Sequence, residues 1–526
     1  MSKQSYDVAS AVNRWYRSRL AIVIESILTG FLVGFVVLFF RLSINRGEDG
    51  RRWLYARLAQ EAWWWTALWA LCLVLAGLFL GWAASFRPMI KGSGIPQIKG
   101  VLLRKLQLRW PSELPLKLIT GIIGLGAGLS LGREGPSIQI GAYVGRGVLS
   151  VTRRHNWERK SLITSAAAAG IAAAFNAPLA GVIFALEEFQ KSFSPLLLAC
   201  VMGSSWAANM AASTVFGLDP VFDFREITPL TLESFPWIAL LGILCGLGGD
   251  LFKRLLYFFQ DLYPRLHIPQ ILRPVLPLLI SIPLGFFLFD LTGGGHALIE
   301  KLSWESSLPS ILLLTLLAKM VWTALCYGSG ASGGIFLPLL ACGALLGTAF
   351  GEVLTLTGLS APDSNLNFMI LGMAAFFTGV VKAPVTGAVL ILEMSGNFNH
   401  LGSLVLACLS ALVASDLIRS RAVYDVLLDR ILLGRKPEQD EIRQKGKIII
   451  EIQANPSSAM VHRSVKHVPW PSDCLVVGIN RGENEILPTG DTEILPGDRL
   501  VILTYEINAA ENTRYLNTLA ETRDSP

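Results

Sequence analysis

Long stretches of this 526-residue chain carry almost no charged side chains. Four of them are Ala21–Phe40, Trp63–Trp82, Pro236–Gly249 and Ser310–Thr323. Several approach the roughly 20 apolar residues that a helix needs to cross a bilayer. Only 16% of all residues are charged, whereas soluble domains average about a quarter. We therefore expect a multi-pass membrane protein in contact with the lipid bilayer, and not a large soluble helical protein.

Residues at the ends of these stretches indicate how the chain is oriented in the membrane. Tryptophans gather near the ends, as expected for an interfacial aromatic belt: Trp53, Trp63, Trp64, Trp65, Trp82 and Trp110. Basic residues flank the first and the last stretch: Arg14, Arg17, Arg19, Arg419, Arg421, Arg430, Arg435 and Lys436. The positive-inside rule then places both termini in the cytoplasm, although four arginines after the first stretch oppose it: Arg41, Arg46, Arg51 and Arg52. We expect a bacterial inner (plasma) membrane.

Other compositional features narrow the function. The net charge of +6 is small for this length and argues against a nucleic-acid partner. Six of the seven cysteines lie inside apolar stretches, and the six histidines show no helical pairing, so we expect neither a metal nor a cofactor. The apolar stretches offer no nucleophile–base pair, which argues against an enzyme embedded in the membrane.

Glycine and proline break the apolar stretches repeatedly. The breaks lie at Gly92–Pro96, Gly132–Pro136, Ala177–Pro178, Gly328–Pro338 and Ala383–Pro384. Broken backbone at membrane depth is tolerated only where it is buried in protein or lines a cavity. Such discontinuous helices mark substrate sites in transporters.

The breaks belong to an internal repeat. Asn176–Glu188 matches Lys382–Met394 at five of thirteen positions, and Gly132–Pro136 corresponds to Gly334–Pro338 at nearly the same spacing. This predicts an all-α membrane domain built as an inverted-topology repeat, with its site where the two halves meet.

Three of the breaks open apolar helices. Their motif residues are Gly92, Gly94 and Pro96, then Gly132, Arg133, Gly135 and Pro136, then Gly333, Gly334 and Pro338. Glycine lets the backbone approach a ligand closely, and free N–H groups at helix N-termini favour anions. The sequence thus predicts an anion site built from backbone N–H groups. A fixed cation such as a lysine or arginine at its centre would hold a transported ion too tightly. Ordinary helix breaks remain the alternative.

Two glutamates are candidates for proton chemistry. Glu134 lies inside an apolar stretch, where an acid is costly and functional by default. Its carboxylate can take the place of the anion and leave on protonation; an ion pair with Arg133 is the alternative. Glu187 recurs in the other half as Glu393, which indicates a shared architectural role. Glu188 has no acidic counterpart, so it is the more specialised group, with a solvated cap as its alternative.

Together these motifs resemble the CLC family of chloride channels and chloride/proton exchangers, over roughly residues 20–430. The resemblance implies that Ser93, the backbone amides of Ile335 and Phe336, and Tyr424 contact the central anion. It implies that Glu134 is the gating and proton-accepting carboxylate and that Glu188 is the internal proton-transfer carboxylate. It also implies a homodimer with one pathway per subunit.

The resemblance favours chloride/proton antiport, because the position of Glu188 is typically acidic in exchangers and apolar in channels. The alternative is a passive voltage- or pH-gated chloride channel on the same fold. A sensor whose main function lies in its C-terminal part is a third hypothesis.

The C-terminal part departs from the paired CBS modules common in the family. We expect the membrane domain at 1–432, a charged linker at 433–446, a small α+β cytoplasmic domain at 447–508 and a polar tail at 509–526. Four β-rich runs are predicted at Lys447–Ile452, Leu475–Arg481, Ile486–Thr492 and Gly497–Ile502. They resemble the TrkA-C (RCK C-terminal) module, which implies dimerisation and binding of a small regulatory ligand; a domain that only stabilises the dimer is the alternative.

Overall fold

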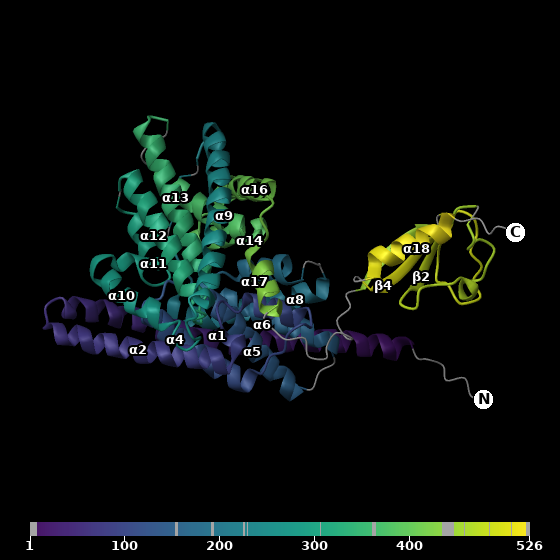
Figure 1. The fold of residues 1–526 in the computed structure, drawn as a ribbon, viewed down its shortest axis with the longest axis horizontal. Coiled ribbons are helices and arrows are strands. Elements are labelled where there is room, and N and C mark those ends of the chain that lie inside the picture. Colours follow the sequence, from purple (N-terminus) through teal and green to yellow (C-terminus); the bar gives the residue numbers. More distant parts are fainter. Residues whose placement is uncertain are drawn as a thin grey trace. The chain divides into compact units, whose positions relative to one another are not determined.

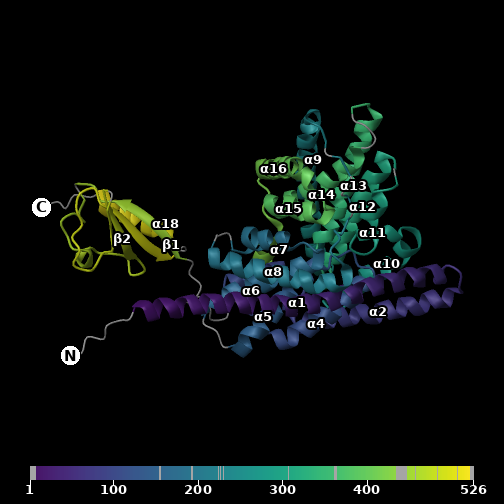
Figure 2. The ribbon, with the colours of Figure 1, turned by 180° about the vertical axis from the view of Figure 1, so that it is seen from behind.

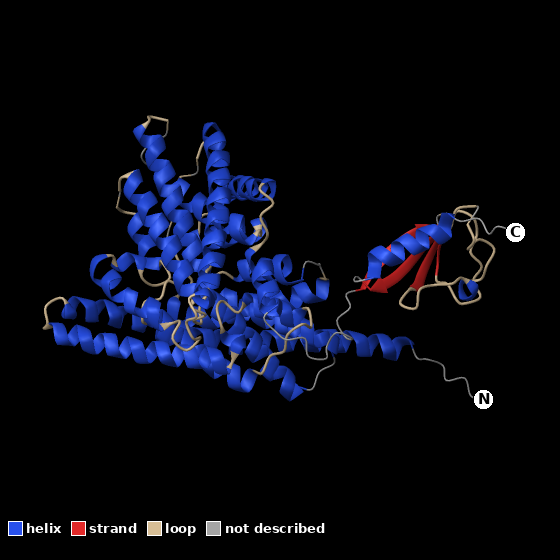
Figure 3. Cartoon of the chain, viewed as in Figure 1, coloured by secondary structure: helices blue, strands red, loops and turns tan. Residues whose placement is uncertain are grey.

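The computed structural model describes residues 8–152, 156–190, 194–222, 224, 227–228, 230–305, 307–359, 364–433, 447–456, 458–482, 484–505 and 508–521. The chain forms two compact units, Met1–Leu432 and Leu433–Pro526. The described part of the first unit is helical, and the named strands lie in the second (Figures 1 and 3). The charged linker expected at 433–446 lies, except for its first residue, outside the described residues.

The first unit consists of two successive sets of helices. The first set comprises α1 (Val8–Leu58), α2 (Trp63–Phe86), α3 (Ile95–Leu102), α4 (Trp110–Gly126), α5 (Glu134–Thr152), α6 (Asn156–Phe175), α7 (Pro178–Phe184), the π-helical turn η2 (Ala185–Gln190) and α8 (Pro195–Phe216). The second set comprises α9 (Phe235–Arg265), α10 (Val275–Phe287), α11 (His296–Leu302), α12 (Pro309–Gly328), α13 (Phe336–Leu356), α14 (Asn365–Val381), α15 (Pro384–Ser395), α16 (Leu401–Leu417) and α17 (Val423–Leu433).

The two sets pack in the same way. Helix α1 packs on α8 as α9 packs on α16, and α5 packs on α6 as α13 packs on α14. Figures 1 and 2 show the early helices α1, α2, α4 and α5 together, and the later helices α12, α13 and α14 together. The internal repeat predicted from the sequence is therefore present in the fold.

A pair of buried lysines repeats in the two sets. Lys117 of α4 donates from Nζ to the carbonyl oxygens of Ile90 and Gly92, at 2.9 and 2.8 Å. Lys319 of α12 donates to the carbonyl oxygens of Leu291 and Gly293, each at 2.9 Å. Both side chains are fully buried, and a buried ammonium must be compensated by such acceptors. Each lysine thus fixes the loop that leads into a short helix, α3 or α11.

The helices suit a bilayer. Within the described residues, seven helices are long and apolar enough to cross a membrane: Leu20–Leu58, Trp63–Phe86, Pro195–Phe216, Leu232–Arg265, Pro309–Gly328, Phe336–Leu356 and Phe398–Leu417. Large apolar side chains remain exposed along them, including Leu28, Phe35 and Phe39 of α1. Water would penalise such a surface, whereas lipid does not. The first unit is an integral, multi-pass membrane domain.

The second unit is a small α+β domain. Its strands are β1 (Lys447–Gln453), β2 (Leu475–Arg481), β3 (Asn484–Ile486) and β4 (Arg499–Tyr505), and its helix is α18 (Ala509–Glu521). The strands form one antiparallel sheet in the order β1-β4-β2-β3. Alternate residues of β1 and β4, such as Ile450, Ile452, Leu500 and Ile502, form its core.

Two details of this domain differ from the predictions. The run Ile486–Thr492 is a strand only at its first residue, because Pro488 cannot donate to a ladder and Gly490 favours a turn. Residues 509–521 of the expected polar tail form α18, which contacts β1 and β4. Its Leu516 and Ala520 are buried in the core, one helical turn apart. The helix therefore belongs to the domain.

Candidate functional site

The three glycine-rich turns predicted from the sequence meet inside the membrane domain. Gly132 and Gly334 exchange two backbone hydrogen bonds, each 2.7 Å long. Gly92 donates to the carbonyl of Ala331 and accepts from Gly333, both at 3.1 Å. The reciprocal Gly132–Gly334 pair joins equivalent points of the two repeats. The glycine-rich turns predicted to form the site therefore meet where the two repeats contact each other.

These turns open the short and the long helices of the site. Gly94, Glu134 and Ile335 stand at the starts of α3, α5 and α13. Gly94 has φ of +91°, a conformation that glycine adopts without strain. A Cβ on Gly135 would lie 2.7 Å from the Ser93 carbonyl oxygen, so the turns approach as closely as they do only because glycine is present. The N-terminal N–H groups of three helices thus converge.

Glu134 lies at this convergence. It is fully buried, and neither carboxylate oxygen has a hydrogen-bond partner among the described residues. The backbone N–H groups of Glu134 and of Leu337, in the first turn of α13, face the carboxylate, at a geometry too loose for a hydrogen bond. A buried carboxylate without good partners is costly. Its position at two helix N-termini is one that an anion would also favour.

The other predicted anion contacts surround the same region. Ser93 is fully buried, and its Oγ accepts from the Ile95 N–H at 3.2 Å. Ile335 and Phe336 are buried at the start of α13. Tyr424 of α17 is fully buried, and its hydroxyl has no hydrogen-bond partner among the described residues. Tyr424 interacts electrostatically with both Glu134 and Glu188.

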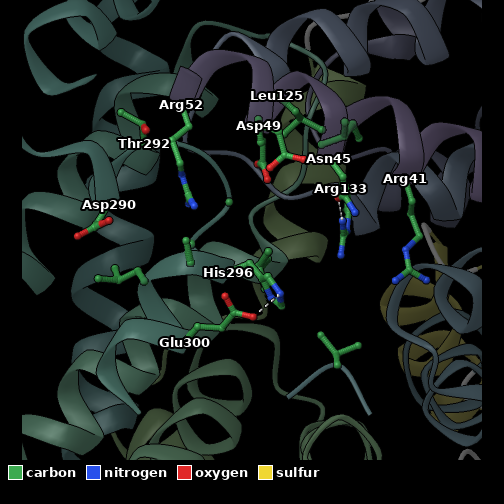
Figure 4. A pocket seen from close by; sticks show the side chains of 18 of the residues that line it. Arg41, Asn45, Asp49, Arg52, Leu125, Arg133, Asp290, Thr292, His296 and Glu300 are labelled. Atoms are coloured by element: carbon green, nitrogen blue, oxygen red, sulfur yellow. Dashed lines mark hydrogen bonds and ion pairs between the residues drawn. The ribbon is translucent and has the colours of Figure 1, made fainter. Parts of the chain in front are cut away.

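A cavity of about 430 Å³ adjoins the Gly132–Gly334 contact. Leu131, Arg133 and Leu337 line it, together with Arg41 and His296. In Figure 4, Arg133 and Arg41 lie side by side, and His296 is linked to Glu300. Arg133 donates to Asn45 Oδ1 at 2.7 Å, and among the described residues no ion pair joins it to Glu134. Arginines near an opening of this kind attract anions.

Glu187 and Glu393 perform the architectural role predicted for them. Glu187 accepts from the N–H groups of Val385 and Thr386 at 3.2 and 2.7 Å, at the start of α15. Glu393 accepts from Leu179 and Ala180 at 3.0 and 2.7 Å, at the start of α7. Each half therefore caps a helix of the other half, where the macrodipole favours negative charge.

Glu188 takes a different partner. It lies beside Glu187 in η2, a π-helical turn of the kind that is frequent at functional sites. Lys99 of α3 donates to Glu188 Oε1 at 2.8 Å, and both side chains are more than 90% buried. The same Lys99 nitrogen pairs with Asp425 of α17, whose side chain is 34% exposed. Glu188 is therefore not a solvated cap.

Sequence reasoning missed Lys99, Arg41 and Asp425. Lys99 interrupts an apolar run and Arg41 directly follows one, and an intramembrane ion should by default be treated as functional. The prediction applied that rule to Glu134 alone. Asp425 carried no such signal, because it lies among the charged residues that follow the last stretch.

Two sequence families match this chain. The family described as "Voltage gated chloride channel" matches residues 76–416, and the family described as "TrkA-C domain" matches residues 449–516. The TrkA-C match extends into α18, in line with its place in the core of the second unit.

Among its relatives are proteins described as "H(+)/Cl(-) exchange transporter ClcA". The one from Vibrio cholerae is 34% identical over 461 residues, which cover 84% of this chain and 96% of the relative. The one from Vibrio parahaemolyticus is 36% identical over 440 residues, 80% of this chain and 92% of the relative.

Solved structures share the fold. The structure titled "X-ray crystal structure of a slow cyanobacterial Cl-/H+ antiporter" superposes with a TM-score of 0.75 at 31% identity, covering 79% of this chain and 98% of that one. A "CLC-type fluoride/proton antiporter" superposes with a TM-score of 0.64 at 23% identity, covering 77% and 97%; at that identity the likeness concerns the fold alone.

Proposed function

The chain belongs to the voltage gated chloride channel family, and from this membership we propose that it exchanges chloride for protons across the membrane. Relatives and a structural neighbour described as exchangers match it over most of their length. The observation that carries the proposal is Glu134, a carboxylate buried without a hydrogen-bond partner among the described residues, at converging helix N-termini.

Glu134 acts as the gate and as one of the proton acceptors. When ionised, its carboxylate occupies the place that the helix N-termini offer to an anion. Protonation removes the charge, the side chain leaves, and chloride enters the same place. Because one site holds either the carboxylate or the chloride, uptake of a proton and movement of an anion become linked.

Chloride in the centre of the protein contacts the Ser93 hydroxyl, the N–H groups of Ile335 and Phe336, and the Tyr424 hydroxyl. All four residues are buried, which supports the proposal, and the Tyr424 hydroxyl has a proton to donate. Neutral donors bind the ion without trapping it, which conduction requires.

Glu188 passes protons between Glu134 and the side of the membrane on which α17 ends. The chain works as a homodimer with one pathway per subunit, in a bacterial inner membrane with both termini in the cytoplasm. The TrkA-C domain binds a small regulatory ligand there.

The direct test is proton movement driven by chloride. Purified full-length protein in proteoliposomes, given an outward chloride gradient and no pH gradient, should pump protons into the vesicles against their electrochemical gradient. Robust chloride flux without proton movement would identify a passive channel and refute the proposal.

A further inference from the structure

One ammonium group joins the proposed internal proton carrier to a carboxylate near water. Lys99 Nζ lies 2.8 Å from Glu188 Oε1 and also pairs with Asp425 Oδ1. Side-chain exposure rises along the series, from 5% for Glu188 and 7% for Lys99 to 34% for Asp425. The three side chains therefore form a short path from the buried Glu188 to solvent.

The charges of this cluster favour uptake of one proton. Two ionised carboxylates and one ammonium carry a net charge of −1, which a poorly solvated site disfavours. A single added proton makes the cluster neutral. Because both carboxylates contact the same nitrogen, they titrate as a coupled pair and not independently.

The neighbouring charged and titratable groups do not change the charge balance of the Glu188, Lys99 and Asp425 cluster. Arg421 interacts with Asp425 from the solvent side, and its own hydrogen-bonded partner is Asp429. Tyr424, with Tyr327 beside it, faces Glu188 from α17. Glu187, next to Glu188 in η2, is directed at the start of α15.

We propose that Asp425 collects protons from the aqueous side on which α17 ends and delivers them to Glu188, with Lys99 positioning both carboxylates. This inference rests on the proposed exchange function. In the transfer step, Lys99 gives one ammonium proton to Glu188 while it takes the proton of Asp425. Glu188 ends protonated, Asp425 ends ionised, and Lys99 remains an ammonium group.

The position of Asp425 also connects the proton path to the anion path. Asp425 directly follows Tyr424, and both stand in the first turns of α17. The proposed proton path and the proposed anion contact therefore share the first turn of α17.

The test compares Asp425→Asn with Asp429→Asn in the full-length protein. Asp429 lies one turn further along α17, is half-exposed and pairs with Arg421, so it is a carboxylate of the same helix whose basic partner is not Lys99. In proteoliposomes, Asp425→Asn should lower proton flux about tenfold and keep chloride flux. A positioned acid–base group accelerates proton transfer by roughly 10²–10⁴-fold. Water can deliver protons in its place, so the expected loss is smaller than this. Asp429→Asn should leave both fluxes unchanged.

Lys99 is tested through the pH profile. Lys99→Gln removes the positive charge between the carboxylates, so proton uptake should shift to higher pH and the proton-to-chloride ratio should change. Lys99→Arg should restore most of the wild-type profile. A merely structural role for Lys99 would alter the amount of folded protein and leave the ratio and the profile unchanged.

The outcomes separate the two proposals. Wild-type protein that moves chloride without protons overturns the exchange function. Coupled wild-type protein with an equally coupled Asp425→Asn variant overturns the role of Asp425 alone. If Asp425→Asn loses both fluxes and Asp425→Glu does not restore them, Asp425 is structural. That result also overturns its proposed role in proton delivery.

Discussion

Replacing Glu134 with glutamine should give a protein whose chloride flux no longer responds to pH and is no longer coupled to protons. Glutamine has the shape of the protonated acid but cannot ionise. It therefore never competes with chloride for the converging N-termini of α5 and α13. Since no proton can bind at this position, none is exchanged. Chloride flux measured from pH 4 to 8 should be flat in the variant and steep in the wild type.

A matched control for this variant is Glu300→Gln. Glu300 lines the cavity beside the site and pairs with His296, so the substitution removes a nearby carboxylate without touching the helix N-termini. It should retain the pH dependence of the wild type. If Glu134→Gln kept normal coupling, another carboxylate would have to be the gate.

Replacing Glu188 with glutamine should preserve chloride flux and reduce proton flux below detection. Glu134 remains able to open and close, and the anion contacts at Ser93 and Tyr424 are unchanged. The amide cannot accept a proton from the Lys99 cluster, so protons no longer cross the protein. Parallel recordings with chloride- and pH-sensitive electrodes measure both fluxes in the same vesicles.

Glu187→Gln provides the control next in sequence. Glu187 accepts hydrogen bonds from Val385 and from the N–H and hydroxyl groups of Thr386. An amide offers one acceptor oxygen in place of two, so this variant should be less stable to heat. Its remaining flux should keep the wild-type proton-to-chloride ratio. The reverse pattern, with coupling lost in Glu187→Gln and kept in Glu188→Gln, would exchange the two assignments.

Much of the site could be predicted from local sequence signals. Glycine and proline at Gly92–Pro96, Gly132–Pro136 and Gly333–Pro338 have strong conformational preferences, and apolar runs on either side show that the turns are buried. The matched segments Asn176–Glu188 and Lys382–Met394 then indicated two halves. The same match indicated a shared architectural role for Glu187 and Glu393, and the structure shows this role to be reciprocal capping.

The remaining features depend on contacts between distant parts of the chain. Asp425 is part of the cluster only because α17 folds back beside α3, where Lys99 pairs with it. No periodicity or spacing links these two residues. Helix α18 was missed for a different reason: its apolar stripe is short, and Leu516 and Ala520 stand among polar residues that are typical of a tail.

The most direct test of exchange is the reversal potential of the current through the wild-type protein in a planar bilayer. With equal chloride on both sides and a pH difference across the membrane, chloride/proton exchange moves the reversal potential away from zero, by a fraction of the roughly 59 mV per pH unit of a pure proton pathway. In the Glu188→Gln variant it should return to zero. A wild-type reversal potential that stays at zero whatever the pH difference would show that chloride moves alone, and would contradict chloride/proton exchange.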